Sequence, residues 1–187
     1  MNFDELSDKF VEHINTAPRE PLFDYEVPRS VRMGTSPDAI YGMWDWNIKP
    51  FENIDWIEDL EARLLIRFPT SFHSLITRYI FPQFDFGPLQ FLANTPEGVE
   101  KSCELRTGIF EDEYLSTSLL QNGFVQFARP AGGSYDPICF DTNNKSTSIE
   151  YSIVNIDHED ILCHDKIKIT KVLAPSFHEL IKQHLAA

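Results

Sequence analysis

The residue with the clearest chemical potential is Cys139, because a cysteine thiolate paired with a histidine is a nucleophile. The chain has three cysteines and six histidines, so such a pair is possible. Cys139, however, stands between Ile138 and Phe140 in an apolar run. Thiols in such surroundings are normally buried and inert. We therefore expect Cys139 to be a core residue, with a thiol dyad as the alternative.

A second group could bind a metal ion, because carboxylate and imidazole side chains recur over a short stretch. The ligands would be Asp157, His158, Asp160 and His164. Acidic residues are common throughout this chain, so we interpret the stretch as an acidic surface loop and expect no metal and no cofactor. Gly132 and Gly133 indicate a turn, since no Lys-Ser or Lys-Thr pair follows them as in a phosphate-binding loop. Neither a GxSxG nor an HExxH motif occurs, and we do not expect an enzyme.

The elements that must position these residues centre on a predicted β-hairpin. Residues 135–141 hold four apolar residues between Asp136 and Asp141, and so short a run indicates a core strand. The polar residues 142–146 indicate a loop. Residues 148–153 alternate polar and apolar side chains, which is the period of a half-buried strand. We predict that the two strands form the centre of one antiparallel sheet.

Helical patterns surround this hairpin. Apolar residues recur at helical spacing in several segments, and two pairs, Asp55 with Glu58 and Ser176 with Glu179, match the capping-box pattern. We predict helices over residues 1–17, 55–65 and 110–121, one that Pro69 opens, and a last one capped by Ser176. Further strands are expected at 89–93, 124–128 and 167–173. One buried cluster should join helices and hairpin through Trp56, Phe72, Ile138, Phe140, Ile149, Tyr151 and Phe177.

The segment 18–53 is rich in proline and predicts an irregular arm laid across the domain. Trp44 and Trp46 lie within it. Large rings of this kind usually anchor a segment to a core, and a ligand platform is the alternative. We therefore divide the chain into an N-terminal helix and arm at 1–43, packed on the domain, and the domain itself at 44–187.

Composition limits the possible partners. The formal net charge is −13, and such a surface repels nucleic acid and anionic lipid while it attracts basic proteins. Solubility alone is an alternative reason for the acidity. No apolar run approaches the ~18 residues that a membrane span requires. The N-terminus lacks the pattern of a signal peptide and the cysteines are widely spaced, which predicts a cytoplasmic protein without disulfides.

Several motifs in order resemble the SMI1/KNR4 family, the core of the SUKH superfamily. They are Trp56-Ile57-Glu58, Leu64, Pro69 opening a helix with Phe72 and Leu75-Ile76, the strand from Asp136 to Asp141, the acidic Asp157-His158-Glu159, and Ser176-Phe177 with Leu180. The resemblance covers about residues 44–185. It implies an α+β fold with a mixed, mostly antiparallel sheet wrapped by helices. It also implies protein binding, since bacterial members resemble immunity proteins that neutralise polymorphic toxins, often nucleases, and fungal members act as regulatory scaffolds.

From the resemblance and the charge we expect an immunity-type module whose acidic face binds a basic protein, such as a toxin domain. The alternative is an intracellular scaffold with no toxin partner. The candidate partner-binding residues are Glu111, Asp112, Glu113, Asp136, Asp141, Asp157, Glu159 and Asp160. Structural roles compete with this assignment, because Asp112 and Glu113 also favour a helix N-terminus and the two strand-flanking aspartates also hold turns.

Overall fold

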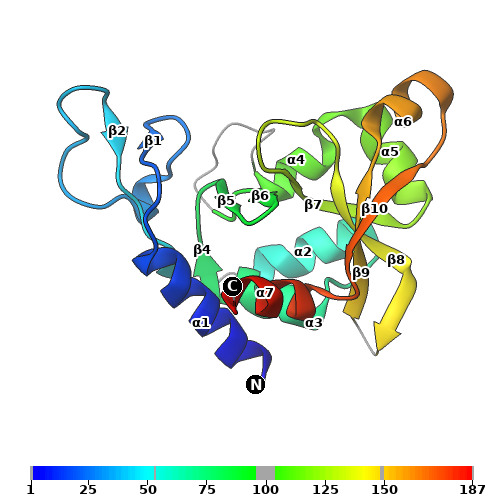
Figure 1. The fold of residues 1–187 in the computed structure, drawn as a ribbon, viewed down its shortest axis with the longest axis horizontal. Coiled ribbons are helices and arrows are strands. Elements are labelled where there is room, and N and C mark those ends of the chain that lie inside the picture. Colours follow the sequence, from blue (N-terminus) through cyan, green and yellow to red (C-terminus); the bar gives the residue numbers. More distant parts are fainter. Residues whose placement is uncertain (1, 53, 96–103, 148–149, 187) are drawn as a thin grey trace.

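The computed structural model describes residues 2–52, 54–95, 104–147 and 150–186, with the backbone alone for 145–147 (Figure 1). It has an α+β architecture in which helices cover a six-stranded antiparallel sheet, and this confirms the predicted fold class. A single parallel bridge, between Ala93 and Glu104, lies outside the named strands of the described chain. Within the same residues, no helix is both long and apolar enough to cross a membrane.

The six strands of the large sheet lie side by side in their order along the chain. Across the sheet they are β10 (Ile169–Ala174), β9 (Glu150–Ile156), β8 (Ile138–Thr147), β7 (Phe124–Pro130), β6 (Leu89–Phe91) and β5 (Phe84–Phe86). Every neighbouring pair is antiparallel, so each connection simply reverses the chain direction. The segments predicted as strands at 89–93, 124–128 and 167–173 correspond to β6, β7 and β10.

The predicted hairpin exists, but its first strand is longer than expected. Residues 142–146, predicted to be a loop, continue β8. The register shifts between Asp141 and Lys145 and again between Lys145 and Thr147. Irregularities of this kind let an extra residue sit in one strand while pairing resumes beyond it. The turn at 148–149, and with it the predicted core residue Ile149, lies outside the described residues.

Seven α-helices occur among the described residues. They are α1 (Phe3–Thr16), α2 (Ile54–Leu64), α3 (Thr70–Arg78), α4 (Leu105–Glu111), α5 (Glu113–Gln121), α6 (His158–His164) and α7 (Phe177–Leu185). Buried residues of α1, α2, α3, α4 and α7 join one apolar cluster with the sheet. α5 and α6 contribute Leu119 and Ile161 to a second cluster. The sheet is therefore covered on both faces.

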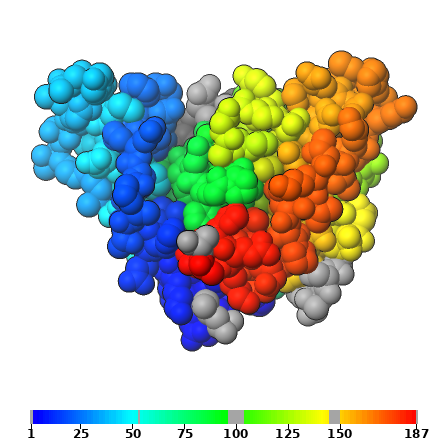
Figure 2. Space-filling view, in the orientation of Figure 1, coloured from blue at the N-terminus to red at the C-terminus, as the bar shows by residue number. Residues whose placement is uncertain are grey.

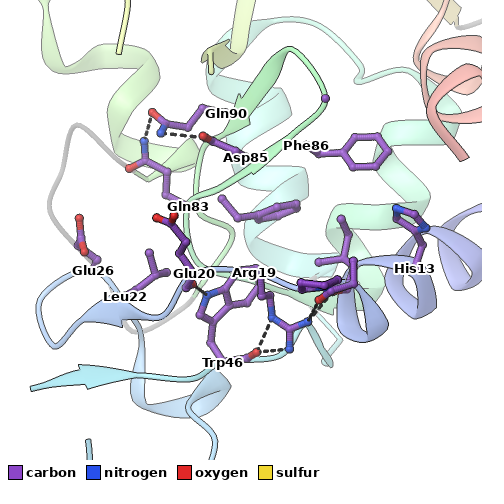
Figure 3. A pocket seen from close by; sticks show the side chains of 15 residues that line it. His13, Arg19, Glu20, Leu22, Glu26, Trp46, Gln83, Asp85, Phe86 and Gln90 are labelled. Carbon is purple, nitrogen blue, oxygen red and sulfur yellow. Dashed lines mark hydrogen bonds between the residues drawn. The ribbon is translucent and has the colours of Figure 1, made fainter. Parts of the chain in front are cut away.

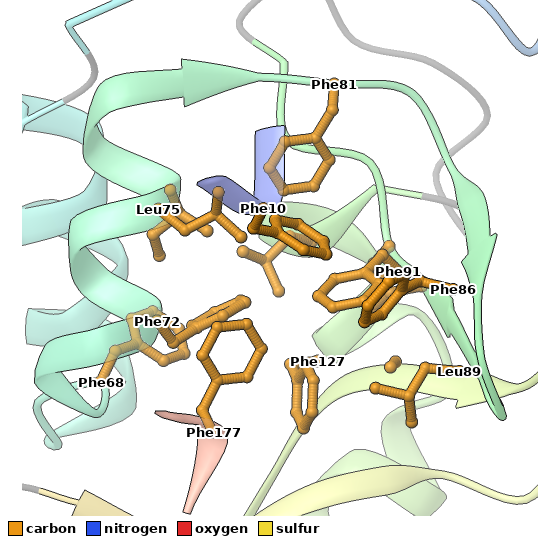
Figure 4. Packing of buried hydrophobic residues seen from close by; sticks show 14 of the residues in the cluster. Phe10, Phe68, Phe72, Leu75, Phe81, Phe86, Leu89, Phe91, Phe127 and Phe177 are labelled. Carbon is orange, nitrogen blue, oxygen red and sulfur yellow. The ribbon is translucent and has the colours of Figure 1, made fainter. Parts of the chain in front are cut away.

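Successive side chains of β8 pack alternately into the larger and the smaller cluster. Phe140 lies in the larger cluster and Cys139 in the smaller one, because successive strand side chains point to opposite faces. The predicted core residues Phe72, Ile138, Phe140, Tyr151 and Phe177 are all buried in the larger cluster. Trp56 is half-buried at its margin. Phenylalanines from helices and strands pack together in this cluster (Figure 4).

Helix boundaries follow local capping more closely than periodicity. α1 begins with a capping box between Asn2 and Glu5, a pair that the periodic pattern did not indicate. α2 begins at Ile54, so Asp55 lies in its first turn and is not the predicted cap. The helix predicted over 110–121 is two helices, α4 and α5, separated at Asp112. The hydroxyl of Ser176 does accept the Glu179 N–H at 3.1 Å, as predicted for α7.

The arm is irregular, as predicted, and is held by short pairings. β1 (Leu22–Phe23) pairs with β2 (Met43–Trp44), and β3 (Lys49–Pro50) pairs with β4 (Tyr79–Ile80). A short 3-10 helix, η1 (Arg29–Val31), lies between β1 and β2. Trp46 anchors the arm, since its side chain is 2% exposed and the Arg19 guanidinium lies 4.8 Å from its ring centroid. Trp44 is half-buried, and its indole N–H donates to Asp24 at 3.0 Å.

Candidate protein-binding face

The acidic residues singled out in the sequence lie around the layer formed by α5 and α6. This layer and the arm stand at opposite sides of the molecule (Figures 1 and 2). The two helices cover one face of β7, β8 and β9, where Leu119 and Ile161 share a cluster with Cys139. We call the outer surface of α5 and α6, with the turn from α4 into α5, the acidic helical face.

The first acidic group forms the junction between α4 and α5. The Asp112 carboxylate accepts the Leu115 N–H at 2.9 Å and caps α5, so the structural role proposed for it is confirmed. Glu111 and Glu113 are exposed, and neither has a salt bridge to a described residue. These two carboxylates remain available to a partner.

The second acidic group is the start of α6, where an acidic loop was predicted. Asp157 caps this helix by accepting the Asp160 N–H at 3.2 Å. Lys168 reaches both carboxylates, at 3.0 Å from Asp157 and 2.7 Å from Asp160. The hydrogen bond from Lys168 is the main reason that the pKa of Asp157 lies below its ordinary value. These two aspartates thus share one lysine, and of this group only Glu159 is exposed.

Asp136 is bound to the start of the same helix. Its Oδ1 lies 2.7 Å from His158 Nδ1 and accepts the His158 backbone N–H at 3.1 Å. Partial burial raises the pKa of Asp136, but the hydrogen bonds from His158 and Ser134 outweigh it and hold the pKa of this carboxyl below its ordinary value. Within the described chain no cluster of three or more histidine, cysteine, aspartate or glutamate side chains is placed to hold a metal, and this includes the four considered as ligands.

The Asp136–His158 contact predicts a pH-dependent contribution to stability. A carboxyl whose folded-state pKa is lowered stabilises the fold above its unfolded pKa, and this contribution is lost as pH falls through the folded-state pKa. Asp136→Asn should therefore lower the free energy of unfolding at about pH 6 and have a smaller effect at about pH 3. Urea denaturation at both pH values measures this, with Glu159→Gln as an exposed control. An equal effect of Asp136→Asn at both values would contradict the assignment.

Asp141, another of the candidate residues, makes its contacts within the fold. It is buried, and its carboxylate accepts the Asn143 N–H at 3.1 Å. Asn143 in turn donates from its side chain to the Asn122 carbonyl at 2.7 Å, where α5 ends. Gly123 has a positive φ of 76° here, and a Cβ at this position would meet the Asn143 side chain at 2.5 Å. The side-chain to backbone hydrogen bond considered for Asp141 is present, but it lies at an irregularity within β8 and not in a turn.

The face also contains residues that sequence reasoning missed. Tyr114 on α5 and Leu162 on α6 are 51% and 48% exposed. The Tyr114 hydroxyl donates to the Asp165 carboxylate at 3.4 Å and so links the start of α5 to the end of α6. Asp165 ends α6 with a positive φ of 53°, a conformation that aspartate tolerates better than most residues. Glu113, Tyr114 and Asp165 line a shallow depression of about 670 Å³ between the helices.

The two cysteines among the described residues lie in different surroundings. Cys139 is fully buried beneath α5 and α6, and burial raises the pKa of its thiol well above the ordinary value, so it is not a thiolate nucleophile. Cys163 is a free, exposed cysteine, and Cys103 lies outside the described residues. Comparison with models of protein families and with curated proteins gives no match for this chain.

Proposed function

We propose that the protein is a protein-binding module that holds a basic protein on its acidic helical face. The observation that carries the proposal is the combination of uncompensated charge with exposed apolar side chains on α5 and α6. Glu159 and Leu162 lie three residues apart on α6 and hence on one side of it. Tyr114 supplies an exposed aromatic ring beside Glu113. Interfaces commonly combine such apolar anchors with a polar rim.

More specifically, we propose that the protein is an immunity protein of the SMI1/KNR4 type, which neutralises a basic toxin domain by covering it. Support comes from the ordered motifs along the chain and from the net charge of −13. A scaffold that binds a host protein and inhibits nothing is the second candidate, supported by the same motifs. The activity of a captured partner, measured with and without this protein, separates the two: loss of activity supports neutralisation, and full activity supports the scaffold.

Charge reversal on the face tests the binding mode. The triple variant Glu111→Arg, Glu113→Arg and Glu159→Arg should associate with the captured partner at least about tenfold more slowly at low salt, because surface charges steer the encounter of oppositely charged proteins. For the unmodified protein, association should slow as salt rises and screens the exposed charges. Partner capture from the source cell followed by association kinetics at two salt concentrations measures both effects.

A matched control separates a local effect from one of overall charge. The triple variant Glu12→Arg, Glu52→Arg and Glu58→Arg makes the same charge change at exposed residues outside the face. It should retain most of the original association rate, and circular dichroism should show both variants folded. A partner that is acidic, or a rate indifferent to salt and to the substitutions on the face, would refute the proposed mode.

A further inference from the structure

A groove lies beside β5, at one edge of the large sheet and away from the acidic helical face. β5 is the outermost strand, and among the described residues it has a strand partner, β6, on one side only. A cavity of about 600 Å³ lies beside it (Figure 3), within the range of about 300–1,000 Å³ of common ligand sites. The opposite wall is the end of α1 and the arm segment that follows it. We call this cavity the edge groove.

The shape of the edge groove suits an extended chain. Its lining includes four consecutive residues, from Phe84 to Gly87, and a surface that touches consecutive strand residues must follow the strand edge. The hairpin turn at 87–88 makes Phe86 and Leu89 the pair that exchanges hydrogen bonds. Alternate residues direct their main-chain groups to opposite sides, so the N–H and C=O of Asp85 face the open edge.

The charges of the groove select for a cation. Glu20 and Glu26 come from the arm and Asp85 from β5, and none of the three forms a salt bridge with a described residue (Figure 3). Glu26 accepts the Phe23 N–H at 2.9 Å, and Asp85 accepts from the Gln90 amide at 3.0 Å. Both bonds come from neutral groups, so the negative charges remain uncompensated.

The lining holds one guanidinium against these three carboxylates, so an excess of negative charge remains. Arg19 donates to the carbonyls of Ile14 and Trp46 and to the side chain of Asn47, all within the protein. Its guanidinium also lies over the Trp46 ring. These contacts use its donors to hold the arm against α1, and they leave few for an anion. Apolar surface from Leu22, Phe84 and Phe86 completes the walls.

We propose that the edge groove binds an extended, arginine- or lysine-containing peptide segment, which pairs with the outer edge of β5 and places its cationic side chains against Glu20, Glu26 and Asp85. Addition of a strand to an open sheet edge is a general mode of peptide recognition, in which main-chain hydrogen bonds give affinity and side-chain pockets give specificity. This site is independent of the acidic helical face, and its test uses peptides and needs no captured partner.

Synthetic peptides test the proposal directly. A fluorescein-labelled hexapeptide of alternating valine and arginine should show saturable binding to the full-length protein in fluorescence anisotropy, and its counterpart with glutamate in place of arginine should not bind. N-methylation of the peptide backbone should abolish binding, because it removes main-chain donors. Heteronuclear NMR on the unmodified protein should place the peptide-induced shifts in residues 13–26 and 83–90.

Variants then assign the charge contacts. Glu20→Arg with Asp85→Arg should weaken binding of the arginine peptide at least about tenfold, since like charges face each other in the complex. Glu111→Arg with Glu159→Arg makes the same charge change on the acidic helical face and should leave the affinity within about twofold. Absence of saturable binding, equal loss in both double variants, equally tight binding of the N-methylated peptide, or equally tight binding of spermine would each overturn the proposal.

Discussion

Replacement of Phe140 by alanine should lower the free energy of unfolding by about 3–5 kcal/mol. The side chain is 0% exposed and belongs to the third residue of β8, an interior strand of the large sheet. Its ring stacks on Phe127 with centroids 4.1 Å apart and lies 5.1 Å from Phe72 of α3. Its removal leaves a cavity between sheet and helices that rigid neighbours fill only in part, and the lost transfer free energy and the cavity add together.

Denaturant melts of the unmodified protein and of Phe140→Ala measure this loss as a change in midpoint at constant slope. Tyr135→Ala is the matched control, because Tyr135 is an aromatic residue of the same chain segment that is 72% exposed. Its effect should stay within about 0.5 kcal/mol. A loss below about 1 kcal/mol in the free energy of unfolding for Phe140→Ala would mean that the ring contributes little to the packing between sheet and helices.

Removal of the Glu150 carboxylate should cost about 1.5–3 kcal/mol, the range for hydrogen bonds to charged groups. Glu150 is buried on β9, and its two oxygens accept the backbone N–H and the hydroxyl of Ser71, each at 2.9 Å. Ser71 lies in the first turn of α3, where backbone N–H groups lack helical partners. A carboxylate from a strand therefore caps the first turn of a helix through a residue that lies 79 positions earlier in the chain.

A double-mutant cycle isolates this contact. Glu150→Ala and Ser71→Ala should each destabilise the fold, and the double variant should lose clearly less than the sum, because both substitutions break one shared interaction. Glu159→Ala, at an exposed carboxylate outside the cycle, should change stability by less than about 0.5 kcal/mol. Strict additivity in the cycle would show that the buried carboxylate acts through other neighbours.

Much of the fold could be predicted from local patterns. The apolar residues of α1 recur every three or four positions, and burial of one helix side needs nothing more. The four apolar residues that begin with Pro137 predicted a core strand because so short a run between turn-forming residues is too short for a helix, and β8 confirms the prediction. Ser176 predicted the start of α7 because its hydroxyl satisfies a local N–H.

The candidate site was harder to predict, because a residue type does not reveal its partner. Asp157, Asp160 and Glu159 look equivalent in the sequence. Only the tertiary structure brings Lys168, from the connection between α6 and β10, to the two aspartates. Glu159 has no salt bridge to a described residue. Asp141 looks like Asp136, but burial and the Asn143 N–H give it a structural role.

Sequence alone thus determined the α+β class, the helical and strand periods and the acidic charge, since each depends on composition or on residues close together in the chain. Only the tertiary structure decided which carboxylates remain uncompensated, that Glu150 caps α3, and that the arm and β5 enclose a groove. These features depend on groups many residues apart, and their pairing follows from how the layers pack.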